Sequence, residues 1–219
     1  MDSPGLDPVH HARALRGLAR INFLSMAARR IRGRLLGLTP RNGSYRLLDV
    51  ACGGGDVAMA AKSWAERKGI NLQVQGCDVS PTAVEYARRR AEARGLQVEF
   101  FQLNALAEEL PSGFDLVSSS LFLHHLTDDQ AREFLPKLSK AGRVVLVQDL
   151  LRTHLGYLMA QVTVRVVSRS RVVWADGPQS VRAAFTLPEV GTLAREAGLV
   201  GSLVGRCWPE RFCLHWETS

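Results

Sequence analysis

Short apolar runs alternate with amphipathic segments along most of the chain. Runs such as RVVLVQDL are apolar enough for the centre of a parallel sheet. The segment from Ser80 to Gly95 has helical spacing, with Ser80 as the expected N-cap, Pro81 at the first helical position and Gly95 at the stop. This alternation predicts an α/β fold with a doubly wound, mostly parallel sheet. The expected strands, seven in all, are RLLDVA, NLQVQGCD, LQVEFFQLN, FDLVSSS, RVVLVQDL, VGSLVG and RFCLHW.

Two segments fall outside this alternation. Residues 1–43 precede the first strand, carry a helical pattern from His10 to about Leu38, and end in the turn cluster TPRNGS. Residues 151–184 follow the fifth strand. We therefore expect one domain over residues 44–219, with an insertion at 151–184 and an N-terminal helical segment at 1–43.

Residues 151–175 of the insertion allow two interpretations. VTVRVV alternates like a strand, whereas the apolar positions Leu155, Met159 and Val162 fit one face of a helix over a longer window. We favour the helix. The two strands after it, VGSLVG and RFCLHW, are joined by a short link, so they are expected to pair antiparallel, with an antiparallel last strand in the sheet.

Composition excludes several classes of protein. The chain has 219 residues, of which 46% are hydrophobic and 22% charged, as expected for one globular domain. No apolar run reaches the roughly 20 residues of a membrane span, and arginines interrupt the N-terminal apolar stretches, so a cytoplasmic protein is expected. The four cysteines show no metal-like spacing, and we expect reduced thiols and no metal site. The formal charge of +7 permits nucleic-acid binding, but we consider it unlikely because the arginines are scattered along helix faces.

A glycine-rich turn carries the first sign of chemistry. Residues 53–58, GGGDVA, follow a strand, open a helix, and satisfy the dinucleotide fingerprint, with Asp78 about 20 residues further on. That turn alone does not separate a dinucleotide from another nucleoside. Asp49 lies in the strand just before the turn, where an acid would repel a pyrophosphate but suit a ligand that carries an ammonium and a sulfonium group.

Four segments in order resemble a known family. LLDVACGGGDVA, VQGCDVSPTAVEYARRRA, FDLVSSSLFLHHL and GRVVLVQDLLR are similar to the successive motifs of class I S-adenosylmethionine-dependent methyltransferases, in particular the small-molecule group related to ubiquinone and menaquinone biosynthesis. The resemblance implies a Rossmann-like methyltransferase fold and S-adenosylmethionine as cofactor. The first motif departs from the common pattern because Ala51 stands at the first glycine position.

The resemblance also implies which residues bind the cofactor, all of them near the ends of the first four strands. They are Asp49 for the ammonium group; Ala51, Gly53 and Gly55 for the methionine part; Asp78 for the ribose hydroxyls; Val79 for the adenine face; Asn104 and Ala105 for the adenine edge; and Ser120 for the methionine end.

Candidates for catalysis follow the fourth and fifth strands. Methyl transfer to a phenol or enol needs alignment of the reactants and gains from a base, most often histidine. Of the adjacent His124 and His125, only one can face a pocket. The resemblance favours His124 toward the substrate and His125 packed beneath, and the alternative is that both are structural. Asp149 is expected to orient the acceptor or, alternatively, to cap the next helix.

The expected function is methyl transfer to a small, partly apolar acceptor, most readily O-methylation of a phenolic or enolic hydroxyl. The N-terminal segment and the insertion are expected to form a helical lid over an apolar pocket, with Asn22, Tyr157 or Trp174 as its polar groups. One alternative is an RNA or protein methyltransferase that uses the basic surface. Another is a non-catalytic, cofactor-binding partner subunit. The sequence does not indicate an oligomeric state.

Overall fold

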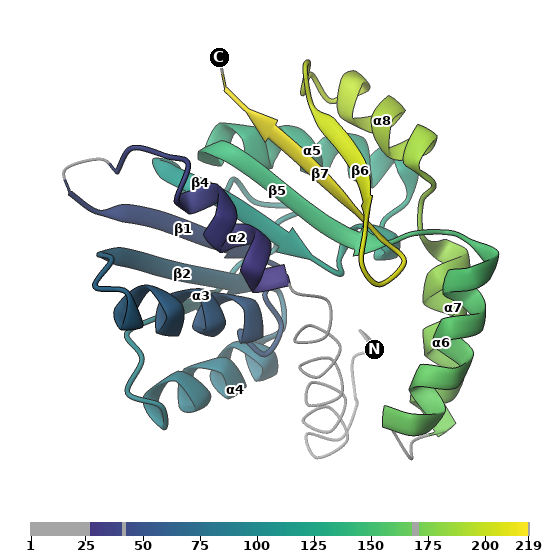
Figure 1. Ribbon diagram of the computed structural model, residues 1–219, viewed down its shortest axis with the longest axis horizontal. Helices are drawn as coiled ribbons and strands as arrows, with labels where there is room; N and C mark the ends of the chain where they lie inside the picture. The colour runs from purple at the N-terminus through teal and green to yellow at the C-terminus, as the bar shows by residue number, and fades with distance from the viewer. Residues whose placement is uncertain (1–26, 41–42, 168–170, 219) are drawn as a thin grey trace.

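One seven-stranded sheet organises the molecule (Figure 1). The computed structural model describes residues 27–40, 43–167 and 171–218, with the backbone alone for 163–167 and 171–176. The strand order is β3-β2-β1-β4-β5-β7-β6. The strands are β1 (Tyr45–Val50), β2 (Leu72–Asp78), β3 (Glu99–Gln102), β4 (Phe114–Ser120), β5 (Gly142–Leu150), β6 (Leu203–Cys207) and β7 (Arg211–Glu217).

The direction of the strands confirms the predicted doubly wound, mostly parallel sheet. Strands β1 to β5 run parallel to their neighbours, and β7 runs antiparallel to both β5 and β6. Because β6 is antiparallel to β7, it points the same way as the parallel strands. Only the last strand reverses, and its first residue therefore lies at the carboxyl ends of the others.

Helices cover both faces of the sheet (Figure 1). One face packs against α2, α3 and α4, and the other against α5 and α8. The two buried clusters include Leu47, Leu116 and Leu146 on the first face and Leu48, Val117 and Val145 on the second. The helices are α2 (Ala27–Leu35), α3 (Asp56–Arg67), α4 (Pro81–Glu92), α5 (Asp128–Ala141) and α8 (Leu187–Glu196).

Local signals in the sequence set the helix starts. The Ser80 hydroxyl accepts a hydrogen bond from the backbone N–H of Ala83, and Pro81 occupies the first helical position of α4, as predicted. Thr127 and Gln130 form a capping box at the start of α5.

The insertion is helical, as the longer window indicated. It forms α6 (His154–Val167) and α7 (Arg171–Ala183), a helix pair that projects beyond the end of β5 (Figure 1). The sequence analysis assigned no element to the second half of α7, where Pro178 lies inside the helix. Helix α7 contacts the single 3-10 turn η1 (Leu123–His125), so the insertion lies beside the histidine pair. Within the described residues, no helix has the length and hydropathy needed to cross a bilayer.

Helix α2 belongs to the core. Ala27, Ile31 and Leu35 are buried and pack in the same cluster as α3 and the sheet. The backbone oxygen of Ala27 accepts a hydrogen bond from Gln148 Nε2, so α2 begins close to the carboxyl end of β5. Residues 1–26, which include Leu24 and Asn22 of the expected lid, lie outside the described residues.

Candidate active site

The chain turns sharply between β1 and α3. Ala51, Gly53 and Gly55 have positive φ angles of 55°, 52° and 71°. A β-carbon at Gly55 would also lie 2.5 Å from the Phe100 ring, so this glycine is required by packing as well as by backbone conformation. Ala51 adopts a left-handed conformation that is strained for a residue with a β-carbon.

Asp78 ends β2 beside this turn and anchors it. Its Oδ2 accepts a hydrogen bond from the Gly53 N–H at 2.8 Å, and its Oδ1 accepts one from the Ser80 N–H at 2.9 Å. Each carboxylate oxygen has a second lone pair for another donor. The next residue, Val79, is 54% exposed although it is apolar. An acid beside an exposed apolar side chain suits a nucleoside, with acceptors for ribose hydroxyls and a surface for the base.

Asp49 is buried in β1 close to the glycine turn. Ser118 Oγ donates a hydrogen bond to its Oδ1 at 2.7 Å. Burial raises the pKa of Asp49 to about 7, although the hydrogen bonds from Ser118 and from the backbone of Ala58 act in the opposite direction. This carboxyl group therefore becomes a stronger acid when a cation binds next to it.

The sequence analysis missed a residue that holds the glycine turn from the side of α4. Arg90 Nη1 donates a hydrogen bond to the Gly54 oxygen at 2.9 Å and lies 2.6 Å from Asp56 Oδ1. The run Arg88–Arg90 was visible in the sequence, but helical periodicity alone does not tell which of three adjacent arginines turns toward a loop.

Asn104 and Ala105 follow β3 in a compact turn. Asn104 Oδ1 accepts a hydrogen bond from the Leu106 N–H at 3.1 Å, and Ala105 is buried. In this structure the Asn104 oxygen stabilises the turn, a common use of asparagine after a strand. A contact of Asn104 with the adenine edge of a cofactor would be additional to its hydrogen bond within the turn.

The ends of β4 and β5 bring His124 and Asp149 together. His124 Nδ1 lies 2.7 Å from Asp149 Oδ1, and the His124 N–H donates to Asp149 Oδ2 at 3.0 Å. Both side chains are buried. Burial acts to raise the pKa of Asp149, but the charge and hydrogen bond of His124, with backbone N–H groups, outweigh it and lower that pKa. Asp149 therefore orients the histidine ring, a role the sequence analysis did not assign to it.

The expectation that His125 packs beneath His124 is wrong. The His125 side chain is exposed, and its ring centre lies 4.0 Å from that of His124. The backbone hydrogen bond from His124 to Asp149 fixes η1 so that the first histidine turns inward, and the second must then turn outward.

Three buried polar groups at this edge of the sheet have no hydrogen-bond partner among the residues that the structure describes. They are the hydroxyls of Ser119 and Ser120, at the end of β4, and the two Nη atoms of Arg211, at the start of β7. Ser120 was expected from the sequence. Arg211 was missed, because an arginine in a strand gives no sequence signal of its burial.

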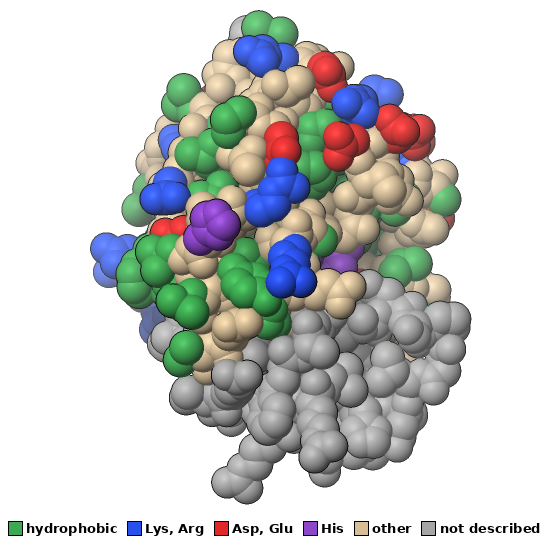
Figure 2. Space-filling model, turned by 90° about the vertical axis from the view of Figure 1, so that its right-hand side faces the viewer, with side chains coloured by type: hydrophobic (Ala, Val, Ile, Leu, Met, Phe, Trp, Pro, Cys, Tyr) green, Lys and Arg blue, Asp and Glu red, His purple; other side chains and the backbone are tan. Residues whose placement is uncertain are grey.

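The helix pair α6–α7 presents apolar side chains to solvent beside this edge. Leu155, Leu158 and Val162 on α6 are exposed, and Figure 2 shows hydrophobic side chains gathered on this end of the molecule. The Tyr157 hydroxyl accepts hydrogen bonds from Gln161, within α6, and from Arg182 of α7, and the second bond ties α6 to α7. The side chain of Trp174 lies outside the described residues.

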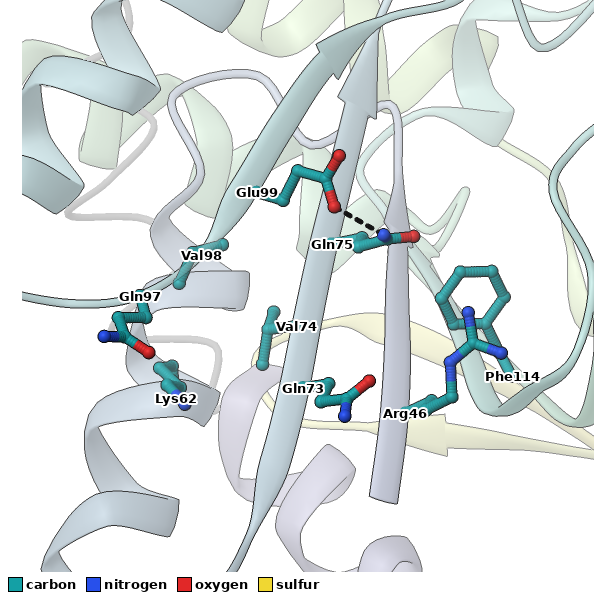
Figure 3. Close-up of a pocket in the computed structure, with 9 residues that line it drawn as sticks. All are labelled: Arg46, Lys62, Gln73, Val74, Gln75, Gln97, Val98, Glu99 and Phe114. Atoms are coloured by element: carbon teal, nitrogen blue, oxygen red, sulfur yellow. Dashed lines mark hydrogen bonds between the residues drawn. The ribbon is translucent and has the colours of Figure 1, made fainter. Parts of the chain in front are cut away.

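A different hollow lies toward the amino ends of β1 and β2, away from the glycine turn (Figure 3). Its volume is about 410 Å³, and its lining mixes polar and apolar side chains, with a Gln75–Glu99 hydrogen bond across β2 and β3. It contains none of the expected site residues. No cluster of possible metal ligands occurs in the parts of the chain that the structure describes.

Comparisons with known proteins agree with this arrangement. Residues 47–143 match the model of a methyltransferase domain family. The chain is 35% identical over 122 residues to a demethylmenaquinone methyltransferase of Thermus thermophilus, a match that covers 54% of each chain and thus about half of that relative. It is 28% identical over 164 residues to a ubiquinone biosynthesis O-methyltransferase of Pseudomonas aeruginosa, covering 73% of this chain and 67% of the relative.

A solved structure shares the fold. An O-methyltransferase from neocarzinostatin biosynthesis, in complex with S-adenosyl-L-homocysteine and 1,4-dihydroxy-2-naphthoic acid, aligns with a TM-score of 0.69 at 20% identity, covering 97% of this chain and 59% of that one. Its identity is low enough that the likeness concerns the fold. Together with the sequence relatives and the ordered motifs at the strand ends, it supports a class I S-adenosylmethionine-dependent methyltransferase, with a methyltransferase domain at residues 47–143.

Proposed function

We propose that this protein transfers the methyl group of S-adenosylmethionine to a phenolic or enolic hydroxyl of a small, partly apolar acceptor. The observation that carries the proposal is the buried His124–Asp149 pair at the ends of β4 and β5. When bound, S-adenosylmethionine supplies the electrophilic methyl group.

The residues around the glycine turn fit this cofactor. Asp78 offers acceptors for ribose hydroxyls, Val79 an apolar surface for adenine, and Gly53 and Gly55 a close backbone approach for the methionine part. The buried Asp49, with a pKa of about 7, suits a cationic ligand better than a pyrophosphate. A dinucleotide would have to place its phosphates beside this acid.

His124 acts as the base in this proposal. Asp149 holds Nδ1, which directs Nε2 to take the proton of the acceptor hydroxyl as the oxygen forms its bond to the methyl carbon. The negative charge of Asp149 stabilises the imidazolium that results. Asp149 is thus a positioning residue, and the chain's main contribution is alignment of the acceptor oxygen.

Several features support a small apolar acceptor. The relatives named above carry the names of quinone biosynthesis enzymes, and the solved neighbour holds a dihydroxynaphthoic acid. Helix α6 carries Leu155, Leu158 and Val162 next to the helix that contacts η1. We infer that α6 and α7, with residues that precede Ala27, form the lid over the acceptor.

The RNA and protein alternative receives less support. The one tight basic run, Arg88–Arg90, is used within the chain. Arg88 donates to the Phe100 oxygen, Arg89 pairs with Glu85, and Arg90 holds the glycine turn. A non-catalytic partner subunit would not need the buried His124–Asp149 pair. Burying such a pair costs desolvation free energy, so its presence favours a catalytic role.

The proposal is tested with radiolabelled S-adenosylmethionine and a panel of catechols, hydroquinones and hydroxynaphthoates, followed by identification of the labelled atom. Label on a hydroxyl oxygen supports the proposal. Label only on nitrogen or carbon, or only on added RNA or protein, contradicts it. Binding of S-adenosyl-L-homocysteine, measured by calorimetry, reports separately on the cofactor site.

A further inference from the structure

Arg211 is a buried arginine that the proposed reaction leaves unused. It is the first residue of β7, lies opposite Leu150 in the sheet, and is 1% exposed. Neither of its terminal nitrogens has a hydrogen-bond partner in the described part of the chain. A buried guanidinium without partners costs several kcal/mol of desolvation, so natural chains keep one mainly where a ligand or a partner charge completes it.

No acidic group within the described residues forms an ion pair with Arg211. Asp149 is near enough to favour its charged form, but the Asp149 carboxylate is bound to His124. Glu210 accepts a hydrogen bond from Thr153. Cys207, opposite Arg211 on β6, has a raised pKa because it is buried, so it is a neutral thiol at neutral pH.

The surroundings of Arg211 are instead positive. Arg30 of α2, which donates a hydrogen bond to Gln148 Oε1, is close enough to lower the pKa of Arg211. Burial is the larger cause and brings that pKa to about 10, so Arg211 stays a cation at neutral pH. The site thus has a positive potential and unused donors, which together favour an anion.

The position of Arg211 relates it to the acceptor. By strand register, Ser120 on β4, Gln148 on β5 and Arg211 on β7 share one face of the sheet at its carboxyl edge. The Ser120 hydroxyl is also buried without a partner. Asp149, which holds the proposed base, precedes the residue opposite Arg211, so its side chain leaves the strand on the other face, and it acts on Arg211 through its charge at this edge.

We propose that Arg211 binds a carboxylate of the methyl acceptor, so that the acceptor is an acidic hydroxylated compound. This inference rests on the proposed methyl transfer. The two terminal nitrogens of a guanidinium present parallel donors that match the two oxygens of a carboxylate. The cofactor also has a carboxylate, but Ser120 of β4, expected at its methionine end, lies two strand spacings, roughly 10 Å, from β7. Asp149, which holds the proposed base, is on the adjacent strand β5, and its charge acts on Arg211. This closer relation assigns Arg211 to the acceptor.

Binding to the protein saturated with S-adenosyl-L-homocysteine tests the inference without any need for turnover. The probes are dihydroxynaphthoic acid and its primary amide, which have the same hydroxyls and ring but differ in charge. Calorimetry is expected to show the acid binding to the natural protein at least tenfold more tightly than the amide, the range of a hydrogen bond to a charged group. Arg211→Met should remove that preference, and Arg211→Lys should retain part of it. Arg206→Met, an exposed arginine on the neighbouring strand, is the matched control and should keep the full preference.

Equal affinity of the natural protein for acid and amide, or no binding of either at millimolar concentration, overturns the inference. A loss of S-adenosyl-L-homocysteine affinity in Arg211→Met overturns it too, because Arg211 would then serve the cofactor.

Thermal unfolding without ligand gives a second measurement. Removal of an uncompensated buried charge should leave the melting temperature unchanged or raise it, whereas a structural arginine would lower it when replaced. Methylation of neutral phenols alone would uphold the proposed function while this inference failed.

Discussion

His124 Nδ1 lies 2.7 Å from Asp149 Oδ1, and neither side chain reaches the surface to any useful extent. The two residues come from neighbouring parallel strands, because η1 follows the end of β4 and Asp149 is the penultimate residue of β5. Asp149 also accepts the backbone N–H of His124, so the same acid fixes both the ring and the turn that carries it. Because Asp149 holds both the backbone N–H and Nδ1 of His124, the other ring nitrogen, Nε2, keeps one direction.

Replacing His124 with alanine should lower kcat by about 10²-fold or more, the usual loss when a general base is removed. Affinity for S-adenosyl-L-homocysteine should change little, because the glycine turn is untouched. Calorimetry and steady-state rates on the acceptor identified from the panel measure the two quantities. His125→Ala is the matched control, and because His125 is exposed it should stay within about twofold of the natural rate. Equal losses in both variants would show that neither histidine is the base.

Asp149→Asn should lower kcat by at least about tenfold while His124 remains in place. An asparagine amide group can donate to Nδ1, which leaves the proton on Nε2 and the ring in the wrong tautomer for a base. The pH–rate profile separates this role from a purely structural one, since the apparent pKa of the rate should shift down when the negative charge is lost. A parallel fall in rate at every pH, with a lower melting temperature, would indicate damage to the fold instead.

Asp78→Ala should weaken S-adenosyl-L-homocysteine binding by about 2 kcal/mol, the range of a lost charged hydrogen-bond acceptor. Asp78 also accepts the Gly53 and Ser80 N–H groups, so the glycine turn should loosen as well. Asp78→Asn keeps one acceptor and should bind with intermediate affinity. The measurement is calorimetry for the product cofactor and for NADH. Tight NADH binding without binding of S-adenosyl-L-homocysteine would refute the cofactor assignment.

The pKa of Asp49 predicts a stability that depends on pH. Its folded value of about 7 lies above the ordinary 3.8, so the folded state holds a proton that the unfolded state releases. Its favourable contribution is complete below about pH 4 and is lost as the pH rises to about 7. Asp49→Asn removes this dependence, and its stability relative to the natural protein should increase by roughly 2 kcal/mol between pH 5 and pH 8. Urea unfolding at the two pH values measures it; a constant difference would contradict the prediction.

Ala51→Gly should stabilise the protein by about 1 kcal/mol, because a left-handed backbone is strained for alanine and not for glycine. Ala60→Gly, in the middle of α3, is the control and should destabilise by about the same amount. Chemical denaturation of both variants gives the comparison. If Ala51→Gly destabilises as Ala60→Gly does, the strain at position 51 is absent in solution.

Much of the fold could be predicted because its signals are local. Ser80 and Pro81 mark the start of α4, and an apolar run such as β5 can only lie inside a sheet. The partners Asp78 and Gly53 also follow from motif spacing, since adjacent parallel strands end at the same edge. The second half of α7 was left without an element, and Pro178 inside it contradicts the local preference for helix.

The contacts that depend on the direction in which a side chain points could not be predicted from the sequence. Nothing in the sequence tells that Asp149 binds His124 rather than the acceptor, or that Arg90 turns to Gly54. The burial of Arg211 depends on the packing of β7 beside β5 and α2, which only the assembled sheet defines. The order of His124 and His125 depends on one backbone hydrogen bond.

The last prediction concerns the N-terminal segment. Deletion of residues 1–38 would remove Ile31 and Leu35 from the core and lower stability for reasons unrelated to catalysis. Deletion of residues 1–26 is the sharper experiment, because it leaves α2 intact. The Gln148–Ala27 hydrogen bond places the point of attachment at the carboxyl end of β5, next to the strand end that carries Asp149.

If residues 1–26 help cover the acceptor, the shortened chain should bind S-adenosyl-L-homocysteine with unchanged affinity and melt within a few degrees of the natural protein. Its kcat/KM for the acceptor should fall by about 10²-fold, since an open site neither excludes water nor aligns the acceptor oxygen. Full activity of the shortened chain on a small acceptor would show that the lid consists of α6 and α7 alone.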